Sequence, residues 1–349
     1  MSWISRLARP DIVALESYTC PERDPDFTRL HANELPWRSG ADASAAGLNR
    51  YPDPQPAELI AALAALYGVD AARVLATRGT DEGIDLLVRT FCRAGRDAVV
   101  VCPPAFVMYA ISARIQGAQV IEVPLLPAQQ FALEPHCLLA RCTEAVKLVF
   151  LCSPNNPTGN LMAEEAVLGI ADALAGRALV VVDEAYVEFA ARASLAAQLS
   201  ARPQLVLLRT LSKAHGLAGA RCGALLGDPE VLSLLRKIIA PFPLTQLSTE
   251  AALGALAPVE LARTHAHVRA ICAERARLAA ALTALPRVRR VWPSDANFML
   301  AEFADAAQAL ALARQAHLLV RDARRYLDQS LRITVGTAAE NQALLEAWT

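Results

Sequence analysis

The chain has 349 residues, of which 54% are hydrophobic and 20% charged, and its formal net charge is −1. This composition indicates a globular protein with more than one domain, and it excludes a disordered chain and a broad basic surface for nucleic acid. There is no apolar stretch of transmembrane length and no signal-like apolar start, so we expect a cytoplasmic protein with no membrane partner. The eight cysteines are scattered with no CxxC pair, which favours reduced thiols over disulfides or a metal site.

The first part of the chain predicts an arm followed by a large domain. Residues 1–45 are rich in Pro, Asp, Asn and Gly, and we expect an arm of which part packs with the small domain. Residues 46–240 begin with helical spacing over 54–67 and then alternate apolar runs with helical stretches. The runs are continuously apolar, which is typical of parallel strands covered by helices on both faces. We predict strands at 98–102, 148–152, 179–182 and 205–208 and helices at 81–93 and 163–174.

Residues 241–349 predict a smaller α+β domain. A long helical stretch over 247–285 is interrupted near Pro258. Beyond it, one helix at 306–315 lies among strand-like pieces at 288–292, 297–301, 318–321 and 331–334. The predicted fold class is therefore α/β, with a large domain built on a mostly parallel sheet covered by helices and a small α+β domain that closes over it.

The loop after the strand at 205–208 contains the first candidate site residues. Ligands of α/β sheets bind at the carboxyl ends of the strands, where this loop begins. Lys213 can form an imine with an aldehyde, provided that its surroundings lower the pKa of its amine. The hydroxyls of Thr210 and Ser212 and the guanidinium of Arg221 suit a phosphate dianion. A surface lysine in a glycine-containing turn is the alternative, and the combination of the four residues argues against it.

The strand at 179–182 leads into a second candidate group. Asp183 directly follows this buried strand, and a buried carboxylate needs a partner. A pyridinium nitrogen would be one, because the carboxylate would keep that nitrogen protonated and the ring able to accept electrons. Tyr186 could place its hydroxyl at the phenolic oxygen of such a ring. An aspartate that caps the next helix is the alternative.

Two further segments place polar groups at a strand end and a helix start. After the strand at 148–152, two prolines and a glycine fix an unusual backbone path, which would hold Asn156 as a rigid amide donor. An ordinary tight turn is the alternative there. Gly79 stands at the start of the helix predicted at 81–93, and free backbone N–H groups at such a start bind phosphate well. A plain N-cap formed by Thr80 or Asp81 is the alternative for that segment taken alone.

Together these segments resemble the fold-type I enzymes that use pyridoxal 5′-phosphate (PLP), and within them the histidinol-phosphate aminotransferases. The resemblance covers essentially the whole chain. It implies the aspartate aminotransferase-like fold and PLP as the cofactor. The segments that carry it are 49–53, 78–84, 152–159, 183–186, 209–223 and 331–336.

The resemblance implies a role for each matching residue. Lys213 resembles the catalytic lysine that holds PLP as a Schiff base and later shuttles a proton. Asp183 resembles the catalytic partner of the pyridinium nitrogen. Tyr186, the third catalytic residue, and Asn156 resemble the ligands of the phenolic oxygen. The implied cofactor-binding set also includes Gly79, Thr80, Asp81, Thr210, Ser212 and Arg221, most of them around the phosphate.

Two aromatic residues complete the implied cofactor site. Phe106 is similar to the aromatic residue that stacks on the PLP ring, where many relatives carry tyrosine. Tyr51 resembles a residue that crosses a dimer interface to the cofactor phosphate of the partner subunit. The resemblance therefore implies a homodimer with shared active sites.

The resemblance also implies substrate contacts. Arg332 resembles the arginine that holds the anionic end of the substrate, and one guanidinium can bind either a carboxylate or a phosphate. Arg321 and Tyr18 are candidate second contacts, and Asn33 resembles part of an arm motif near the substrate. A salt bridge within the small domain is the alternative role for Arg332.

The implied function is transamination of L-histidinol phosphate with 2-oxoglutarate, giving imidazole acetol phosphate and glutamate in histidine biosynthesis. The chain departs from the family at His215, where relatives often have phenylalanine, and at Ala220, where they often have a larger apolar residue. Neither departure removes a catalytic group. An aromatic amino acid aminotransferase or a threonine-phosphate decarboxylase shares the same core segments. A non-catalytic PLP-sensing regulator is an alternative of another class, although such proteins usually add a basic DNA-binding segment.

Overall fold

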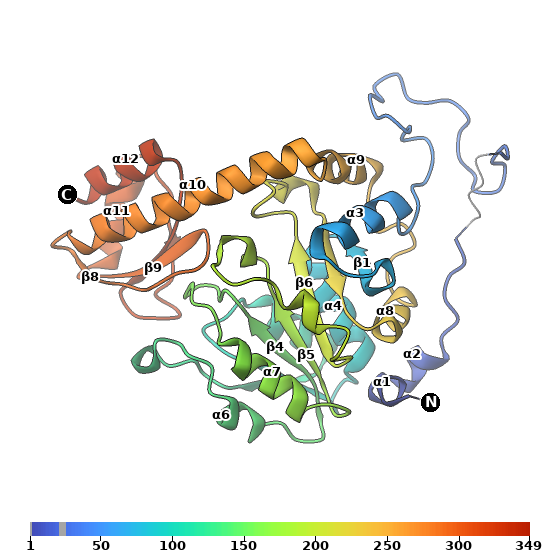
Figure 1. The fold of residues 1–349 in the computed structure, drawn as a ribbon, viewed down its shortest axis with the longest axis horizontal. Coiled ribbons are helices and arrows are strands. Elements are labelled where there is room, and N and C mark those ends of the chain that lie inside the picture. The colour runs from blue at the N-terminus through green and yellow to red at the C-terminus, as the bar shows by residue number, and fades with distance from the viewer. Residues whose placement is uncertain (1, 21–25) are drawn as a thin grey trace.

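The large domain is built on a seven-stranded sheet in the computed structural model, which describes residues 2–20 and 26–349 (Figure 1). The strand order is β1-β7-β6-β5-β4-β2-β3, and only β7 runs antiparallel to its neighbours. The predicted mostly parallel sheet is therefore confirmed. The strands are β1 Val74–Thr77, β2 Ala98–Val101, β3 Gln119–Glu122, β4 Val146–Cys152, β5 Leu179–Asp183, β6 Leu205–Thr210 and β7 Gly223–Leu226.

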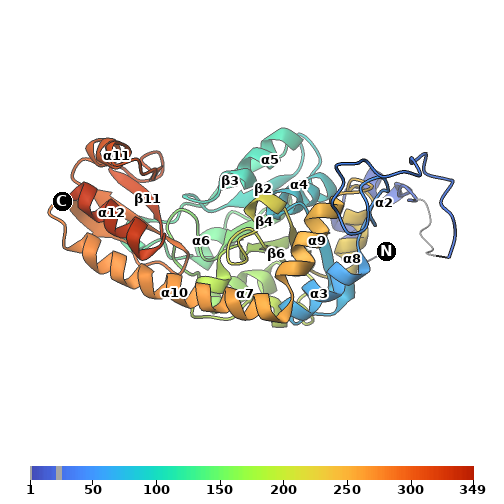
Figure 2. The same ribbon diagram turned by 90° about the horizontal axis from the view of Figure 1, so that it is seen from above.

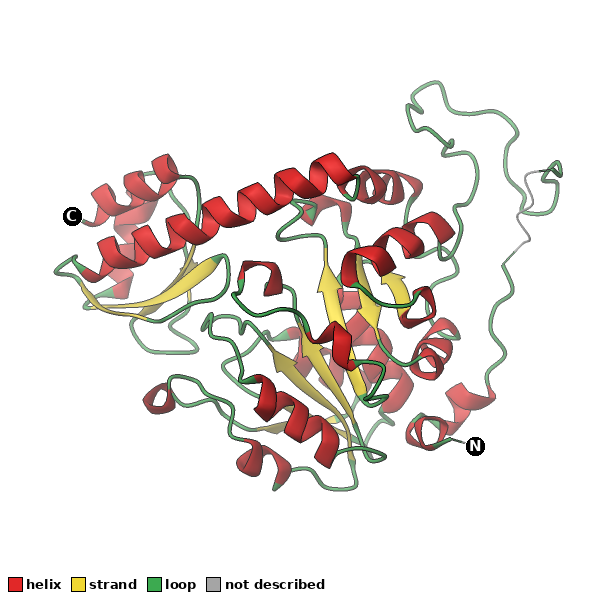
Figure 3. Cartoon of the chain, viewed as in Figure 1, coloured by secondary structure: helices red, strands yellow, loops and turns green. Residues whose placement is uncertain are grey.

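Helices cover both faces of this sheet (Figure 3). Successive residues of a strand point to opposite faces, so Val100 and Val149 pack in one hydrophobic cluster while Val99 and Leu148 pack in the other. Because both clusters are buried, the central strands need runs of apolar residues rather than an alternating pattern. One face is covered by α3 Ala57–Tyr67, α6 Pro135–Leu139, α7 Glu164–Ala173 and α9 Gln246–Ala255, and the other by α4 Thr80–Phe91, α5 Met108–Gln116 and α8 Pro229–Arg236.

The first helices of the arm pack on the large domain. These are α1 Trp3–Leu7 and α2 Pro10–Ala14. Ile4 belongs to the cluster shared with α4 and α8, and the Ser5 hydroxyl donates to the Glu230 carboxylate at 2.6 Å. Farther along, the arm runs outside the body of the protein and its end reaches α9, where the Ala45 N–H donates to Glu250 at 3.2 Å (Figure 1). The predicted domain boundaries at 45 and 240 stay predictions, and α9 packs with the large sheet.

The small domain has a four-stranded antiparallel sheet in the order β10-β11-β9-β8. The long helix α10 links this domain to the large one (Figure 2). As predicted, the helical stretch is broken at Pro258, which begins α10. The elements are α10 Pro258–Thr283, β8 Val288–Val291, β9 Phe298–Phe303, α11 Ala306–Gln315, β10 Arg321–Asp322, β11 Ser330–Thr334 and α12 Ala338–Trp348.

Short 3-10 turns lie at Ala71–Arg73, Pro127–Gln129, Val187–Phe189, Leu195–Gln198 and Ala218–Ala220. In the part of the chain that the structure describes, every helix is too short or too polar to span a lipid bilayer.

Candidate active site

A cavity of about 140 Å³ lies at the carboxyl ends of β4, β5 and β6. Eleven of the twelve predicted cofactor-binding residues line it, and Tyr51 is the exception. Three residues that the sequence did not indicate, Cys152, Ala185 and Ala218, line it as well. The predicted residues in the cavity are Gly79, Thr80, Asp81, Phe106, Asn156, Asp183, Tyr186, Thr210, Ser212, Lys213 and Arg221.

Asp183 ends β5 and is only 3% exposed. Its carboxylate accepts two hydrogen bonds, from the Tyr109 hydroxyl at 2.7 Å and from the Ala185 N–H at 3.1 Å. Burial raises the pKa of Asp183 to about 6, although both hydrogen bonds and the charge of Lys213 oppose that rise. The carboxylate is therefore poised to gain from a cationic partner in the cavity.

Lys213 lies in the loop that follows β6 and lines the same cavity. Partial burial lowers the pKa of its amine, and the positive charge of Arg332 lowers it further, while Asp183 opposes both effects. Its Nζ lies 5.6 Å from the centre of the Tyr186 ring. The lowered pKa increases the neutral fraction of the amine, which is the form that attacks a carbonyl or accepts a proton.

A chain of three polar side chains connects the two domains at the cavity. The Asn156 amide donates to the Tyr186 hydroxyl at 3.3 Å. Arg332, on β11 of the small domain, donates to the Asn156 carbonyl oxygen at 2.5 Å. Burial raises the pKa of Tyr186, which keeps the phenol protonated, and burial lowers the pKa of Arg332. Arg332 Nε is buried without a partner among the described residues, so this guanidinium has capacity for another acceptor.

The start of α4 and the end of the Lys213 loop form an anion cradle. Gly79 precedes the helix with φ +80°, and a Cβ at this position would lie 3.1 Å from Arg221 Nη2. Arg221 itself has φ +53° and contacts Asp81 at 3.2 Å. The hydroxyl of Thr210 accepts from the Ser212 N–H at 3.1 Å. A helix start beside a guanidinium and hydroxyl groups is suited to a phosphate.

β7 brings the two halves of this cradle together. It lies between β1, which leads to Gly79, and β6, which leads to the Lys213 loop. A Cβ at Gly223 would lie 2.6 Å from the Arg209 carbonyl oxygen and 2.9 Å from the Gly79 Cα. Only glycine allows this approach, so Gly223 sets the spacing of the cradle.

The predicted substrate residues divide into two groups. Arg321 lies directly opposite Arg332 in the β10–β11 pairing, so the two guanidinium groups are on neighbouring strands of one sheet. Tyr18 is 64% exposed and lines neither this cavity nor the arm pocket described next. The structure therefore brings the two arginines together and leaves Tyr18 apart from them.

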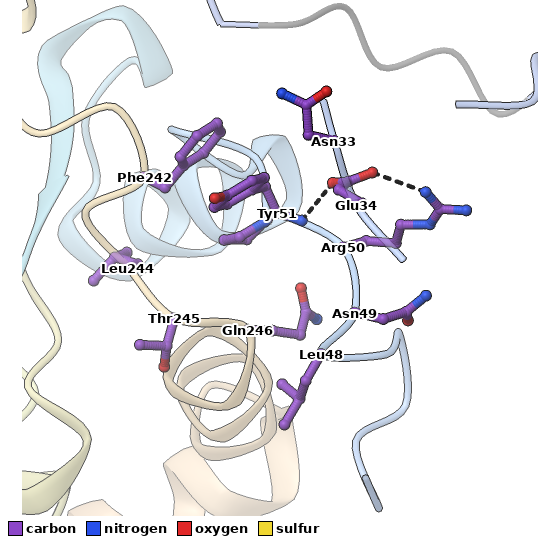
Figure 4. Close-up of a pocket in the computed structure, with 11 residues that line it drawn as sticks. Asn33, Glu34, Leu48, Asn49, Arg50, Tyr51, Phe242, Leu244, Thr245 and Gln246 are labelled. Carbon is purple, nitrogen blue, oxygen red and sulfur yellow. Dashed lines mark hydrogen bonds and ion pairs between the residues drawn. The ribbon is translucent and has the colours of Figure 1, made fainter. Parts of the chain in front are cut away.

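Tyr51 and Asn33 line a separate pocket of about 500 Å³ at the arm (Figure 4). The Tyr51 ring is half-exposed and stacks on Phe242 with 4.5 Å between the ring centres. Glu34 holds the segment, since its carboxylate accepts from the Tyr51 N–H at 2.7 Å and pairs with Arg50 at 2.9 Å. Tyr51 and Asn33 thus lie outside the cavity that Lys213 and Asp183 line.

Comparison with known proteins places this site in a family. The family described as Aminotransferase class I and II matches residues 12–347. The chain belongs to this family. It is 47% identical over 348 residues to the histidinol-phosphate aminotransferase of Stenotrophomonas maltophilia, covering 98% of this chain and 95% of that protein.

Solved structures confirm the fold of this aminotransferase. The histidinol-phosphate aminotransferase of Sinorhizobium meliloti in complex with pyridoxal-5′-phosphate is similar with a TM-score of 0.76 at 28% identity, covering 86% of this chain and 82% of that one. A mutant aspartate aminotransferase of Thermus thermophilus has a TM-score of 0.75 at 23% identity, covering 85% and 87%. The aspartate aminotransferase-like fold predicted from the sequence is therefore confirmed.

The sequence interpretation of this aminotransferase missed Tyr109, which touches Asp183 directly. Tyr109 lies in the first turn of α5, three residues after Phe106, and this helix was not among the predicted elements. The available signal was a second aromatic residue three positions after the predicted stacking residue. That spacing does not indicate which carboxylate lies opposite its hydroxyl.

Proposed function

We propose that this aminotransferase, acting in the cytoplasm, transfers the amino group of L-histidinol phosphate to 2-oxoglutarate with PLP as cofactor. The products are imidazole acetol phosphate and glutamate. The observation that carries the proposal is the single cavity in which a lysine amine, a buried carboxylate and an anion cradle converge. The substrate is inferred from the near full-length similarity to the histidinol-phosphate aminotransferase of Stenotrophomonas maltophilia.

The residues present fit PLP. The cradle of Gly79 and Arg221 suits its phosphate, Asp183 suits its ring nitrogen, and Lys213 suits its aldehyde. When bound, PLP supplies an electrophilic carbon and a protonated ring that withdraws electrons from the substrate. Burial of Asp183 supports this assignment, because a carboxylate held in low dielectric stabilises a neighbouring cation strongly. Phe106 lines the same cavity and provides an aromatic surface for the ring.

Lys213 and Tyr186 act on protons and orientation. With its amine pKa lowered, Lys213 would take the proton from the substrate Cα and hold it for return. Tyr186 keeps its proton because burial raises its pKa, so its hydroxyl and the Asn156 amide beside it would be the donors that hold the phenolic oxygen. These contacts fix the ring against which Lys213 works.

Arg332 and Arg321 bind the substrate anions. The two substrates present different anions to one site, a phosphate and a carboxylate. Two guanidinium groups on neighbouring strands can bind either anion by donating forked hydrogen bonds to its oxygens. Arg332 also contacts Asn156, so substrate binding at the small domain is coupled to the side chain that orients the cofactor.

We further propose that the enzyme is a homodimer in which Tyr51 and the arm complete the site of the partner subunit. The arm exposes large apolar side chains, with Leu30 91% and Trp37 76% exposed. Surfaces of this kind are typical of protein interfaces. Tyr51 lies outside the cavity of its own subunit, which supports a role across the interface.

The donor specificity is tested by mixing the PLP form with one amine at a time and without a keto acid. We expect histidinol phosphate to convert the cofactor to its pyridoxamine form fastest. Phenylalanine would convert it first in an aromatic amino acid aminotransferase, and threonine phosphate would release carbon dioxide in a decarboxylase. Either of those results would overturn the proposed substrate. If the protein binds PLP and none of the amines converts the bound cofactor, the protein would be a regulator.

A further inference from the structure

Tyr109 is a buried residue that packs behind the cavity, where it contacts both Phe106 and the Asp183 carboxylate. The residue is 1% exposed and lies in the first turn of α5. Its ring stacks parallel on Phe150, with 5.0 Å between centres and 6° between planes. Its edge meets Phe106, which lines the cavity, with 5.7 Å between centres and 82° between planes. Packing on two sides fixes the ring, and its hydroxyl, which also lies beside the Cys152 thiol, donates to Asp183.

The hydrogen bond from Tyr109 to Asp183 has a fixed direction. Burial and the charge of Asp183 raise the pKa of Tyr109 well above its usual value, so the phenol stays protonated and donates. Of the two hydrogen bonds to the carboxylate, the one from Tyr109 is the shorter, at 2.7 Å against 3.1 Å from the Ala185 N–H. It is also the strongest influence that opposes the rise in the pKa of Asp183 caused by burial.

We propose that Tyr109 is a positioning residue that keeps the Asp183 carboxylate ionised and aimed into the cofactor cavity. The inference rests on the proposed function, in which Asp183 faces the ring nitrogen of PLP. Tyr109 does not line the cavity itself, so it acts through Asp183 and not by touching the cofactor. The titratable groups that face Asp183 from the surrounding elements are Tyr109, Cys152, Asp81, Lys213 and Tyr186.

The test is Tyr109→Phe, which keeps the ring and both ring contacts and removes only the hydroxyl. Apoenzyme is titrated with PLP from pH 6 to pH 9, and the dissociation constant is read from the visible absorbance of the bound cofactor. Loss of a hydrogen bond to a charged group raises the pKa of Asp183 further. We expect PLP to bind about tenfold more weakly than in the wild type at pH 6, with the two affinities converging near pH 9.

The pH dependence separates this role from a merely structural one. If Tyr109 only filled space, Tyr109→Phe would change the affinity for PLP by the same factor at every pH, or not at all, and either result overturns the proposal. The matched control is Tyr67→Phe, which also removes a buried hydroxyl but one with no partner among the described residues. We expect this control to keep the wild-type pH profile.

A double-variant comparison covers the case in which Tyr109→Phe folds poorly. Asp183→Asn removes the charge to which Tyr109 donates. The double variant Asp183→Asn/Tyr109→Phe should therefore fold even if Tyr109→Phe alone does not. Its PLP affinity should differ from that of Asp183→Asn by less than about twofold. A large additional loss would overturn the proposal. Failure of the proposed function is distinguishable in the wild-type protein, which would then show no visible cofactor band, or a band that another amine or no amine converts.

Discussion

Replacement of Asp183 by asparagine should stabilise the apoenzyme while it weakens the cofactor site. The pKa of Asp183 is about 6, against 3.8 for an unperturbed aspartate. Each unit of pKa corresponds to about 1.4 kcal/mol, so the ionised carboxylate costs the folded state about 3 kcal/mol. Asparagine carries no charge but cannot accept the hydrogen bonds of both Tyr109 and the Ala185 N–H, a loss of about 1 kcal/mol. The net gain expected for the variant is about 2 kcal/mol.

The sign of this effect depends on pH. The raised pKa means that Asp183 favours the folded state at low pH and that this contribution is lost as the pH rises from about 4 through about 6. The stability difference between Asp183→Asn and wild-type apoenzyme should therefore be largest above pH 7 and should vanish or reverse near pH 4. Urea unfolding of both apoproteins at pH 4, 5, 6, 7 and 8 measures it.

Asp97→Asn provides a control of opposite sign. Asp97 is also buried, but hydrogen bonds and the charge of Arg93, at 2.7 Å, overcome the effect of burial and lower its pKa. Its replacement should therefore destabilise the protein at pH 8. The reasoning is refuted if Asp183→Asn is less stable than wild type at pH 8, or if its stability difference is the same at every pH.

Three further outcomes are expected. Lys213→Ala should abolish transamination and the visible band of lysine-bound cofactor, whereas Lys147→Ala, at a half-buried lysine outside the cavity, should keep both. A Lys213→Ala enzyme with normal turnover contradicts the assignment. Arg332→Lys should lower kcat/KM for both substrates about 10- to 100-fold, because lysine cannot donate the forked pair of hydrogen bonds. The control Arg263→Lys, at an exposed arginine of α10, should leave both values unchanged. Mixing Lys213→Ala with Tyr51→Ala subunits should restore about a quarter of wild-type activity through hybrid dimers, and no recovery would argue against shared sites.

Four of the strands that are buried on both faces were predicted from their apolar runs, whereas the equally buried short strands β1 and β7 were missed. The apolar runs at 148–152 and 205–208 correspond to β4 and β6, because every residue of such a strand meets a hydrophobic cluster. The edge strand β3, Gln119–Glu122, was missed because it is half-exposed and has polar residues at both ends. The predicted strand at 318–321 is only the two-residue β10, Arg321–Asp322, which is exposed.

The sequence by itself determined which chemical groups the site would contain. Lys213, Asp183 and Asn156 each follow a recognisable buried strand, and the carboxyl ends of parallel strands meet at one edge of a sheet. Local pattern was therefore enough to bring these groups together.

Only the tertiary structure decided which groups pair across the chain. The insertion of β7 between β1 and β6 sets Arg221 against Gly79, and Tyr109 meets Asp183 from 74 residues away. Arg332 reaches Asn156 from the other domain. Tyr51 lies outside the cavity that Lys213 lines, as its predicted role in a partner subunit requires. Such contacts depend on strand order and domain packing, which side-chain periodicity does not encode, because a period reports the face that a residue occupies and not the residue opposite it.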